Sequence, residues 1–121
     1  MTVAPSRIFM SRDTVLASTG IAIEVSPGLN IGPIRPSFSK LIVDGGTSHG
    51  LVARLTATFS SMWIKDSRFT HLGGDGVRIA HDQAPLTFYG SRVTNCESSN
   101  NSGDGFHVSD ACVTLLENVA F

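Results

Sequence analysis

The sequence contains few charged residues and no long run of helix-forming residues. Asp, Glu, Lys and Arg together make up 16% of the chain, against about a quarter in an ordinary globular domain. Stretches rich in Ala, Leu, Glu and Lys, which long helices favour, are absent. Glycine accounts for 12 of the 121 residues, and Ser, Thr and Asn are also plentiful. This composition is typical of a domain built from strands and turns.

The charge and hydropathy patterns argue against two classes of partner. The formal net charge is −1, and the nine Lys and Arg residues are scattered along the chain, so there is no basic patch for nucleic acid or an anionic membrane. The longest apolar runs are far shorter than the roughly 20 residues of a membrane-spanning helix. Residues 1–10 contain one Arg and no extended apolar stretch, so we expect no secretory signal peptide in this chain.

The two cysteines, Cys96 and Cys112, are too few for a disulfide framework or a four-ligand zinc site. They could form one bridge, but two free and partly buried thiols are the simpler expectation. The glycine-rich segment 73–76 (GGDG) lacks the Lys-Ser/Thr pair of a phosphate-binding loop. No nucleophile set or nucleotide fingerprint is present, so we expect neither a cofactor nor a metal.

A four-residue pattern recurs along the chain: Gly, an apolar residue, any residue, and a second apolar residue. It occurs at 20–23 (GIAI), 50–53 (GLVA), 76–79 (GVRI) and 105–108 (GFHV). Apolar alternation after a glycine predicts a short strand that begins at a tight turn. The intervals between the glycines are 30, 26 and 29 residues. A persistent motif with a varying interval indicates a β-solenoid, which absorbs insertions in its surface turns.

Two further strand-like segments are expected in each repeat. The second is predicted at 39–43, 62–65, 86–89 and 113–116, and the third at 66–69, 90–93 and 117–120. Strands of successive coils would lie about 4.8 Å apart, which would place inward residues in columns. The two expected columns are Ile21, Leu51, Val77 and Phe106, and Ile64, Phe88 and Leu115.

The segments 74–79 (GDGVRI) and 102–108 (SGDGFHV) resemble repeats of the pectate-lyase-like superfamily. Its members include pectate lyases, polygalacturonases, mannuronan epimerases and phage tail spikes. The resemblance covers residues 20–121 and implies an all-β, right-handed parallel β-helix of about four coils. Residues 1–19 show no coil motif and are expected to form an N-terminal cap or lead-in segment. Because the chain stops in mid-coil, we expect a fragment of a longer polypeptide or a solenoid capped by a partner.

The residues just before the glycines are the best candidates for catalysis. Thr19, His49, Asp75 and Asp104 are expected at equivalent positions of successive coils, with neighbours about 5 Å apart. Retaining glycosidases hold their two carboxylates about 5 Å apart, and inverting enzymes hold them further apart. Asp-Gly is also a common turn dipeptide in which the glycine takes a positive φ. A purely structural role for these aspartates therefore remains open.

The outward column Val52, Arg78 and His107 offers a second type of site. An outward Arg can pair with a uronate carboxylate, and the resemblance implies that lyases and epimerases of this fold use basic residues in that way. A simple solvated face is the alternative. Trp63 and Tyr89 fall at outward positions, where an aromatic ring stacks on a sugar or anchors a subunit interface. For Trp63 the interface is the preferred interpretation.

The resemblance leaves three functions open. The first is a polysaccharide-binding module of a trimeric phage tail spike, fibre or surface adhesin, located on a virion or outside the cell. The second is an enzyme: a glycoside hydrolase using Asp75 and Asp104, or a uronate lyase or epimerase using Arg78 and His107. The third is a structural spacer or decoration protein. The polar segment 95–102 is expected to be a turn insertion, which would suit the lip of a sugar groove or any surface loop. The small number of coils favours the first function.

Overall fold

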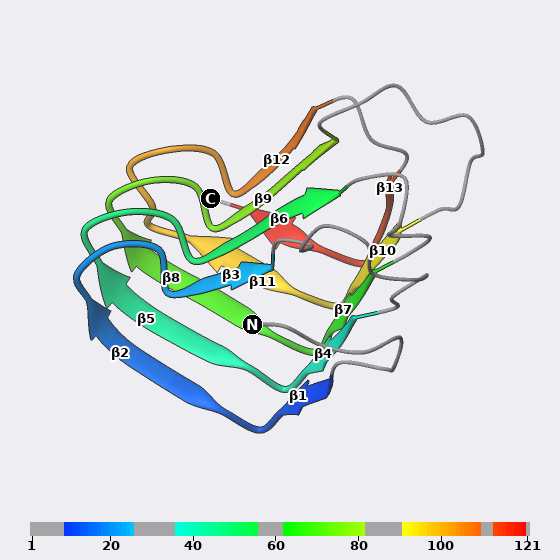
Figure 1. Ribbon diagram of the computed structural model, residues 1–121, viewed down its shortest axis with the longest axis horizontal. Coiled ribbons are helices and arrows are strands. Elements are labelled where there is room, and N and C mark those ends of the chain that lie inside the picture. Colours follow the sequence, from blue (N-terminus) through cyan, green and yellow to red (C-terminus); the bar gives the residue numbers. More distant parts are fainter. Residues whose placement is uncertain (1–8, 26–35, 56–61, 82–90, 110–112, 121) are drawn as a thin grey trace, which may run out of the picture.

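The computed structural model describes residues 9–25, 36–55, 62–81, 91–109 and 113–120 (Figure 1). Within these residues the chain is all-β, with no helix. Consequently the described part contains no helix that is long and apolar enough to cross a membrane.

The strands form three sheets, here named A, B and C. Sheet A contains β1 (Phe9–Ser11), β4 (Ser37–Ser39), β7 (Trp63–Lys65), β10 (Ser91–Thr94) and β13 (Val113–Leu116). Sheet B contains β2 (Thr14–Ser18), β5 (Ile42–Gly46), β8 (Arg68–Leu72), β11 (Glu97–Ser99) and β14 (Val119–Ala120). Sheet C contains β3 (Ile23–Val25), β6 (Leu51–Leu55), β9 (Val77–His81) and β12 (Phe106–Ser109).

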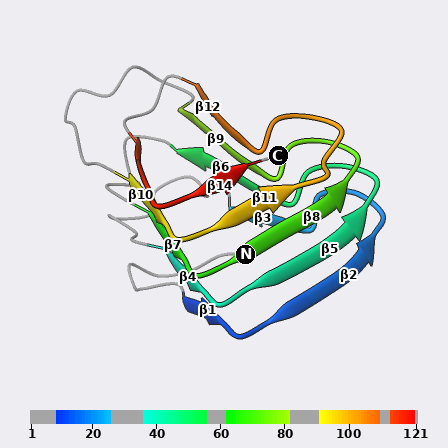
Figure 2. The same ribbon diagram turned by 180° about the vertical axis from the view of Figure 1, so that it is seen from behind.

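Every strand pairing is parallel, and the chain visits the sheets in the fixed order A, B, C. We call one passage through the sheets a rung; β4, β5 and β6 form one such rung. Figures 1 and 2 show the rungs side by side from two opposite directions, with each strand lying next to its counterpart in the neighbouring rung. The fold is therefore three stacked parallel sheets, consistent with a parallel β-solenoid.

The corner between sheets A and B has the same two-residue length in every rung, and its first residue has a left-handed φ. These residues are Arg12, Lys40, Asp66, Asn95 and Glu117, with φ between 51° and 61°. A second left-handed position recurs at Ala17, Gly45, His71 and Asn100, near the end of sheet B. A left-handed residue turns the chain sharply. Because both turns recur at fixed positions, they hold successive rungs in register.

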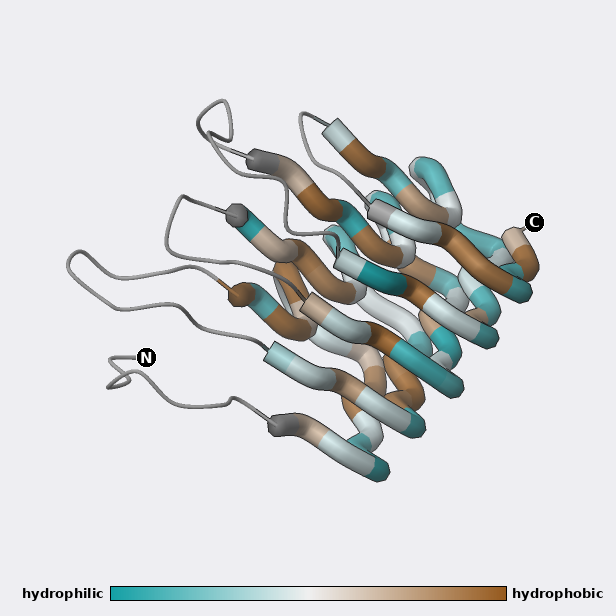
Figure 3. Tube along the Cα trace, turned by 90° about the vertical axis from the view of Figure 1, so that its right-hand side faces the viewer, coloured by the Kyte–Doolittle hydropathy of each residue, from teal (hydrophilic) through white to brown (hydrophobic). Residues whose placement is uncertain are grey.

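The hydrophobic core lies between the three sheets. Leu51, Val77 and Phe106 stand opposite one another on β6, β9 and β12, as the repeat predicts. Leu51 and Val77 are almost fully buried, and Phe106 packs against the same core. Figure 3 shows the apolar segments recurring from rung to rung. Stacking therefore buries apolar side chains that a single rung could not cover.

The structure corrects the expected column in the first rung. Ile23, not Ile21, lies opposite Leu51. The strand therefore begins three residues after Gly20 rather than immediately after it. Gly20 itself has a φ of 139°, a conformation that is open to glycine and that strains other residues. Four residues separate β2 from β3, as four separate β5 from β6, so the turn has its usual length and Gly20 stands two positions earlier in it than Gly50 does. The Gly-apolar pattern alone could not reveal this offset.

The expected second and third segments also need correction in the fourth rung. Val93, not Phe88, stands in the column with Ile64 and Leu115. Segment 90–93 thus overlaps sheet A, not sheet B, and segment 86–89 lies outside the described residues. In the second rung, segment 39–43 spans the corner, and β4 is the counterpart of β7.

The expected polar turn at 95–102 contains a strand instead. Glu97–Ser99 forms β11, and Ser98 lies opposite Phe69 in the column that faces the core. Ser98 is fully buried, and its Oγ donates to the Gly105 carbonyl at 2.7 Å and accepts from Asn101 Nδ2 at 3.0 Å. Because these bonds satisfy the hydroxyl, a polar residue occupies a core position, and hydrophobic patterning does not detect the strand.

Residues 9–18, within the segment expected to be a cap or lead-in, form β1 and β2. These strands pair in register with β4 and β5. The regular stacking therefore includes this part of the chain.

Candidate functional site

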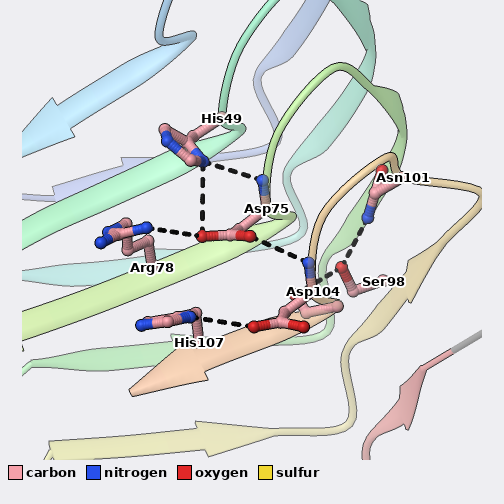
Figure 4. A network of polar contacts seen from close by, with 8 residues as sticks. His49, Asp75, Arg78, Ser98, Asn101, Asp104 and His107 are labelled. Carbon is pink, nitrogen blue, oxygen red and sulfur yellow. Dashed lines mark hydrogen bonds and ion pairs between the residues drawn. The ribbon is translucent and has the colours of Figure 1, made fainter. Parts of the chain in front are cut away.

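His49, Asp75 and Asp104 lie at the same level of three successive rungs, just before β6, β9 and β12 (Figure 4). The Gly50 N–H donates to the Asp75 carbonyl at 3.0 Å, and the Gly76 N–H donates to the Asp104 carbonyl at 2.9 Å. The repeat predicts this alignment. Thr19 does not belong to it, because the two-residue shift in the first rung places Ile21 at this level.

The side chains of this column connect neighbouring rungs. The Asp75 N–H donates to His49 Nδ1 at 2.8 Å, and the Asp104 N–H donates to Asp75 Oδ1 at 2.9 Å. Each side chain thus accepts the N–H of the equivalent residue one rung further on. The first role of His49 and Asp75 is therefore to satisfy backbone donors at the turn before sheet C.

The hydrogen bond from Asp75 fixes the tautomer of His49. A ring nitrogen that accepts an N–H carries no proton, so the imidazole proton lies on Nε2. Consequently the 3.5 Å approach of Nδ1 to Asp75 Oδ2 is not a hydrogen bond in this arrangement. The His49 side chain is 27% exposed, and it retains one free donor.

Asp75 uses both carboxylate oxygens within the protein. Oδ1 accepts the Asp104 N–H, and Oδ2 accepts from Arg78 Nη1 at 3.1 Å. The side chain is only 8% exposed. Buried charged groups are tolerated when they are paired and hydrogen-bonded in this way. Since each oxygen already accepts a donor, neither is placed to give a proton to a leaving group.

Asp104 is the accessible carboxylate of the column. Its side chain is 66% exposed, and Oδ2 lies 2.9 Å from His107 Nδ1. One ligand atom each from Asp75, Asp104 and His107 lie within 4.8 Å of one another, a spacing that a metal ion could bridge. Asp75 would first have to release Arg78 or the Asp104 N–H, so the arrangement fits a dyad of Asp104 and His107 better than a three-ligand metal centre.

The glycines that follow the column serve packing rather than a positive φ. The positive φ expected for the Asp-Gly turns is wrong at Gly76 and Gly105, since among the described glycines only Gly20 and Gly45 have one. A Cβ on Gly50 would lie 2.5 Å from the Gly76 carbonyl oxygen, and one on Gly76 would lie 2.7 Å from that of Gly105. The recurring glycine therefore reflects close contact between the backbones of stacked rungs.

A depression of about 440 Å³ lies beside this column, on the outer face of sheet C. Val52 and Arg54 of β6, and Arg78 and Ala80 of β9, point outward because strand residues alternate between faces. The full lining is Ile21, Ser48, His49, Val52, Arg54, Arg78 and Ala80.

The expected row Val52, Arg78 and His107 does stand across β6, β9 and β12. Val52 is only 4% exposed, so this part of the face is more enclosed than a solvated surface. Arg54 extends the basic surface, and its Nε pairs with Glu24 Oε1 at 3.2 Å. Arg54 escaped the sequence analysis although its outward position two residues after Val52 could have indicated it.

Of the two expected aromatic residues, Trp63 does not lie at this depression. Trp63 is on sheet A, where it is 53% exposed and where the Arg92 guanidinium carbon lies 5.9 Å from its ring centroid. Tyr89 lies outside the described residues. The structure therefore brings His49, Asp75, Arg78, Asp104 and His107 together and places Trp63 on another sheet.

A second groove, of about 580 Å³, follows the corner between sheets A and B. The left-handed residues Lys40, Asp66, Asn95 and Glu117 line it. Several of its polar groups are paired: Asn95 Nδ2 donates to Asp66 Oδ1 at 2.9 Å, and Arg68 lies 3.2 Å from Glu97. Sequence reasoning missed this groove because it placed the turns at the glycines.

Cys96 forms part of the floor of that groove and is a free, buried thiol. Its Sγ donates to the Thr94 carbonyl at 3.3 Å and accepts the Ser67 N–H. Burial raises the pKa of the Cys96 thiol, so the thiol is a structural group rather than a nucleophile. Cys112 lies outside the described residues.

Asp44, at the end of sheet B, has a pKa below its ordinary value of 3.8. The main cause is the hydrogen bond from His71 Nδ1, 2.7 Å from Asp44 Oδ1, and the second is the bond from Thr70 Oγ1, also 2.7 Å. Both bonds favour the ionised carboxylate.

No protein-family model, curated protein or solved structure matches this chain.

Proposed function

We propose that the chain is a glycan-recognition module of the right-handed parallel β-helix type. We place it in a phage tail spike or fibre, or in a surface adhesin, on a virion or outside the cell. The three parallel sheets joined in a constant order support the fold part of this proposal. Crossover connections between parallel strands are right-handed in about 98% of cases, which favours the right-handed form.

The depression on the outer face of sheet C is the observation that supports glycan binding. It combines apolar walls from Ile21, Val52 and Ala80 with hydrogen-bonding groups from Ser48 and His49. A sugar ring presents apolar C–H faces and polar hydroxyl edges, so a site of this mixed character suits it. Because β6 and β9 pair in register, successive sugar units could lie across neighbouring rungs.

Recognition is favoured over glycosidic hydrolysis because both carboxylate oxygens of Asp75 already accept hydrogen bonds within the protein. Hydrolysis requires one carboxyl group to give a proton and a second to act as base or nucleophile. Asp75 accepts from Arg78 and from the Asp104 N–H, which leaves Asp104 as the accessible acid of the pair.

Uronate elimination or epimerisation is the second candidate. The Asp104–His107 contact of 2.9 Å favours it, because a carboxylate that orients a histidine is a recurrent arrangement for a general base. In either reaction His107 would remove the proton next to the uronate carboxylate, and Arg78 would bind that carboxylate. In elimination the adjacent glycosidic C–O bond would then break and its oxygen would take a proton from solvent; in epimerisation solvent would return a proton to the opposite face of the same carbon. This candidate predicts cleavage or epimerisation of acidic glycans, and recognition alone predicts neither.

We further propose that the module associates as a homotrimer through the outer face of sheet A. Trp63 and Leu116 on this face are each about half exposed, which is unusual for large apolar side chains and typical of interfaces. Light scattering after size-exclusion chromatography tests the oligomer. A Trp63→Ser variant should be monomeric, and a wild-type monomer at all concentrations would contradict the trimer.

The binding proposal is tested with a variant that fills the depression sterically. This change should block neutral and charged glycans alike. Ala80→Tyr places a bulky ring among the lining residues, and Thr14→Tyr places the same ring at an exposed position of sheet B, away from the depression and from the proposed interface. A panel of neutral and acidic polysaccharides is screened for binding and, by release of reducing ends and unsaturated uronate, for cleavage.

We expect at least one glycan to bind, Ala80→Tyr to weaken that binding more than about tenfold, and Thr14→Tyr to leave it unchanged. Binding by no glycan, or equal binding by the Ala80→Tyr variant, would overturn the proposed function. Cleavage or epimerisation that is lost in His107→Gln would replace it with the enzymatic candidate.

A further inference from the structure

We infer that the depression on sheet C selects a sugar that carries an anionic group, either a carboxylate or a sulfate. This inference deepens the proposed function and depends on it. The basis is the chemistry of the lining, in which hydrogen-bond donors with positive charge gather beside apolar walls.

Charged groups of one sign line the depression. The charged residues of the lining are Arg54 and Arg78, His49 adds an N–H donor at Nε2, and no described carboxylate belongs to the lining. Most polar surface sites in proteins mix donors and acceptors. A neutral sugar hydroxyl both donates and accepts, so a set weighted toward donors satisfies it only in part. A carboxylate or sulfate only accepts, and therefore matches this lining better.

The acids that pair with the two arginines are themselves outside the lining. Glu24 contacts Arg54 at Nε, and Asp75 contacts Arg78 at Nη1. A guanidinium group has five N–H donors, so each contact leaves other N–H groups for a ligand. The ion pairs also limit the conformations of the two arginine side chains, which reduces the entropy lost on binding.

His49 contributes a donor of fixed position. Because Nδ1 accepts the Asp75 N–H at 2.8 Å, the only imidazole proton lies on Nε2. Asp75 thus acts as a positioning residue for both neighbours: its N–H orients His49, and its Oδ2 holds Arg78. The apolar walls Ile21, Val52 and Ala80 would contact the sugar ring while these donors contact its charge.

The test uses two pairs of probes, each made of a charged oligomer and the same oligomer with its charged group masked or removed. The first pair is a galacturonate oligomer and its methyl ester, and the second is a sulfated galactan oligomer and its desulfated form. The two pairs separate a carboxylate from a sulfate as the source of the negative charge. Calorimetric titrations compare the wild type with Arg54→Gln and Arg78→Gln. Arg68→Gln is the matched control, since Arg68 also pairs with one carboxylate at 3.2 Å, but on sheet B.

We expect the charged member of at least one pair to bind at least about tenfold more tightly than its neutral partner, which is the effect of one charge-assisted hydrogen bond. Arg54→Gln and Arg78→Gln should each remove most of this preference, and Arg68→Gln should not. The preference should also decrease at high salt. Chemical-shift changes should centre on β6 and β9.

Three outcomes would overturn the inference. One is equal binding of charged and neutral probes, with Ala80→Tyr still reducing both; the proposed function would then survive and the charge selectivity would not. Another is an acidic preference that Arg54→Gln and Arg78→Gln leave intact, which would locate the site elsewhere. The third is a preference that Arg68→Gln abolishes equally, which would indicate nonspecific attraction. Binding of no probe or polysaccharide would overturn the proposed function itself.

Discussion

The carboxylate of Asp75 accepts the backbone N–H of Asp104 at 2.9 Å, although the two residues are 29 positions apart in the sequence. The pair that the spacing offers as a catalytic dyad is therefore a connection between two rungs. His49 makes the same connection to the N–H of Asp75. The column thus links sheet stability to the geometry of the candidate binding site, because the same Asp75 also holds Arg78.

Replacing Asp75 should lower the free energy of unfolding most when the new side chain cannot accept the Asp104 N–H. We expect Asp75→Ala to lower the free energy of unfolding by about 1–3 kcal/mol, since it leaves the Asp104 N–H without its partner. Asp75→Asn retains an amide oxygen that can accept this N–H and should have a smaller effect. Urea denaturation measures both. Asp104→Ala is the control, because the Asp104 side chain is 66% exposed; a loss as large as that of Asp75→Ala would contradict the connecting role.

Cys96 should tolerate serine better than valine. Ser67, one rung earlier, accepts the Leu41 N–H at 3.1 Å and donates to the Lys65 carbonyl at 2.8 Å. Cys96 makes the equivalent bonds to Ser67 and Thr94. Cys96→Ser preserves both bonds, and Cys96→Val fills similar space but leaves the Ser67 N–H unsatisfied, which should cost about 1–3 kcal/mol. Thermal unfolding ranks the variants, and a Val variant at least as stable as Ser would refute this interpretation.

Substitution should destabilise the domain at Gly76 but have little effect at Gly45. A Cβ on Gly76 would approach the Gly105 carbonyl and Asn101 Nδ2 within 2.8 Å, so we expect Gly76→Ala to destabilise the domain by about 1–3 kcal/mol. Gly45 has a φ of 75° and ordinary space around its Cβ. Asn100 adopts a comparable φ of 56° at the same level, so Gly45→Asn should be nearly neutral. Similar losses for both variants, measured by urea denaturation, would show that packing does not explain the Gly76 column.

The acid stability of the domain should depend on Asp44. A carboxyl whose pKa is lower in the folded than in the unfolded state stabilises the fold above the unfolded value, and this contribution is lost as pH falls through the folded pKa. The contribution of Asp44 should therefore be complete above about pH 5 and decrease below about pH 4. NMR titration of the carboxyl carbon measures the pKa directly.

Two variants make the Asp44 prediction specific. His71→Ala removes the largest cause of the shift and should return the pKa of Asp44 toward 3.8. Asp44→Asn should make unfolding less dependent on pH in the acid range. A carboxyl that titrates at its ordinary value in the wild type would contradict the prediction. Added salt should weaken the effect only in part, because the two hydrogen bonds are its leading causes.

The Gly-apolar pattern predicted the later rungs well because stacking dictates it directly. A residue without a side chain is needed where Gly76 meets Gly105, and an apolar residue is needed at Val77. The pattern failed where a core position is not apolar, or where the strand does not begin directly after the glycine. Ser98 fills a core position through hydrogen bonds, and Gly20 stands two positions earlier in its turn than Gly50, so β3 does not begin directly after it. Neither exception has a signature in hydrophobic periodicity.

The candidate site could be predicted in position but only partly in role. The spacing placed His49, Asp75 and Asp104 at one level, because equivalent positions of a repeat must stack. It could not show that Asp75 would use both oxygens within the protein, since that depends on the Arg78 rotamer and on the path of the next turn. The donor-weighted lining with Arg54 also requires the assembled face of sheet C.

The invariant corner between sheets A and B has a consequence for engineering and for divergence. Residues 26–36 join β3 to β4, but only residues 110–112 join β12 to β13, so length changes are confined to the connection from sheet C back to sheet A. A foreign epitope inserted there should leave the stack intact. A single added residue at the corner would put every later side chain of that strand on the wrong face, so insertions and deletions should accumulate on one side of the molecule only.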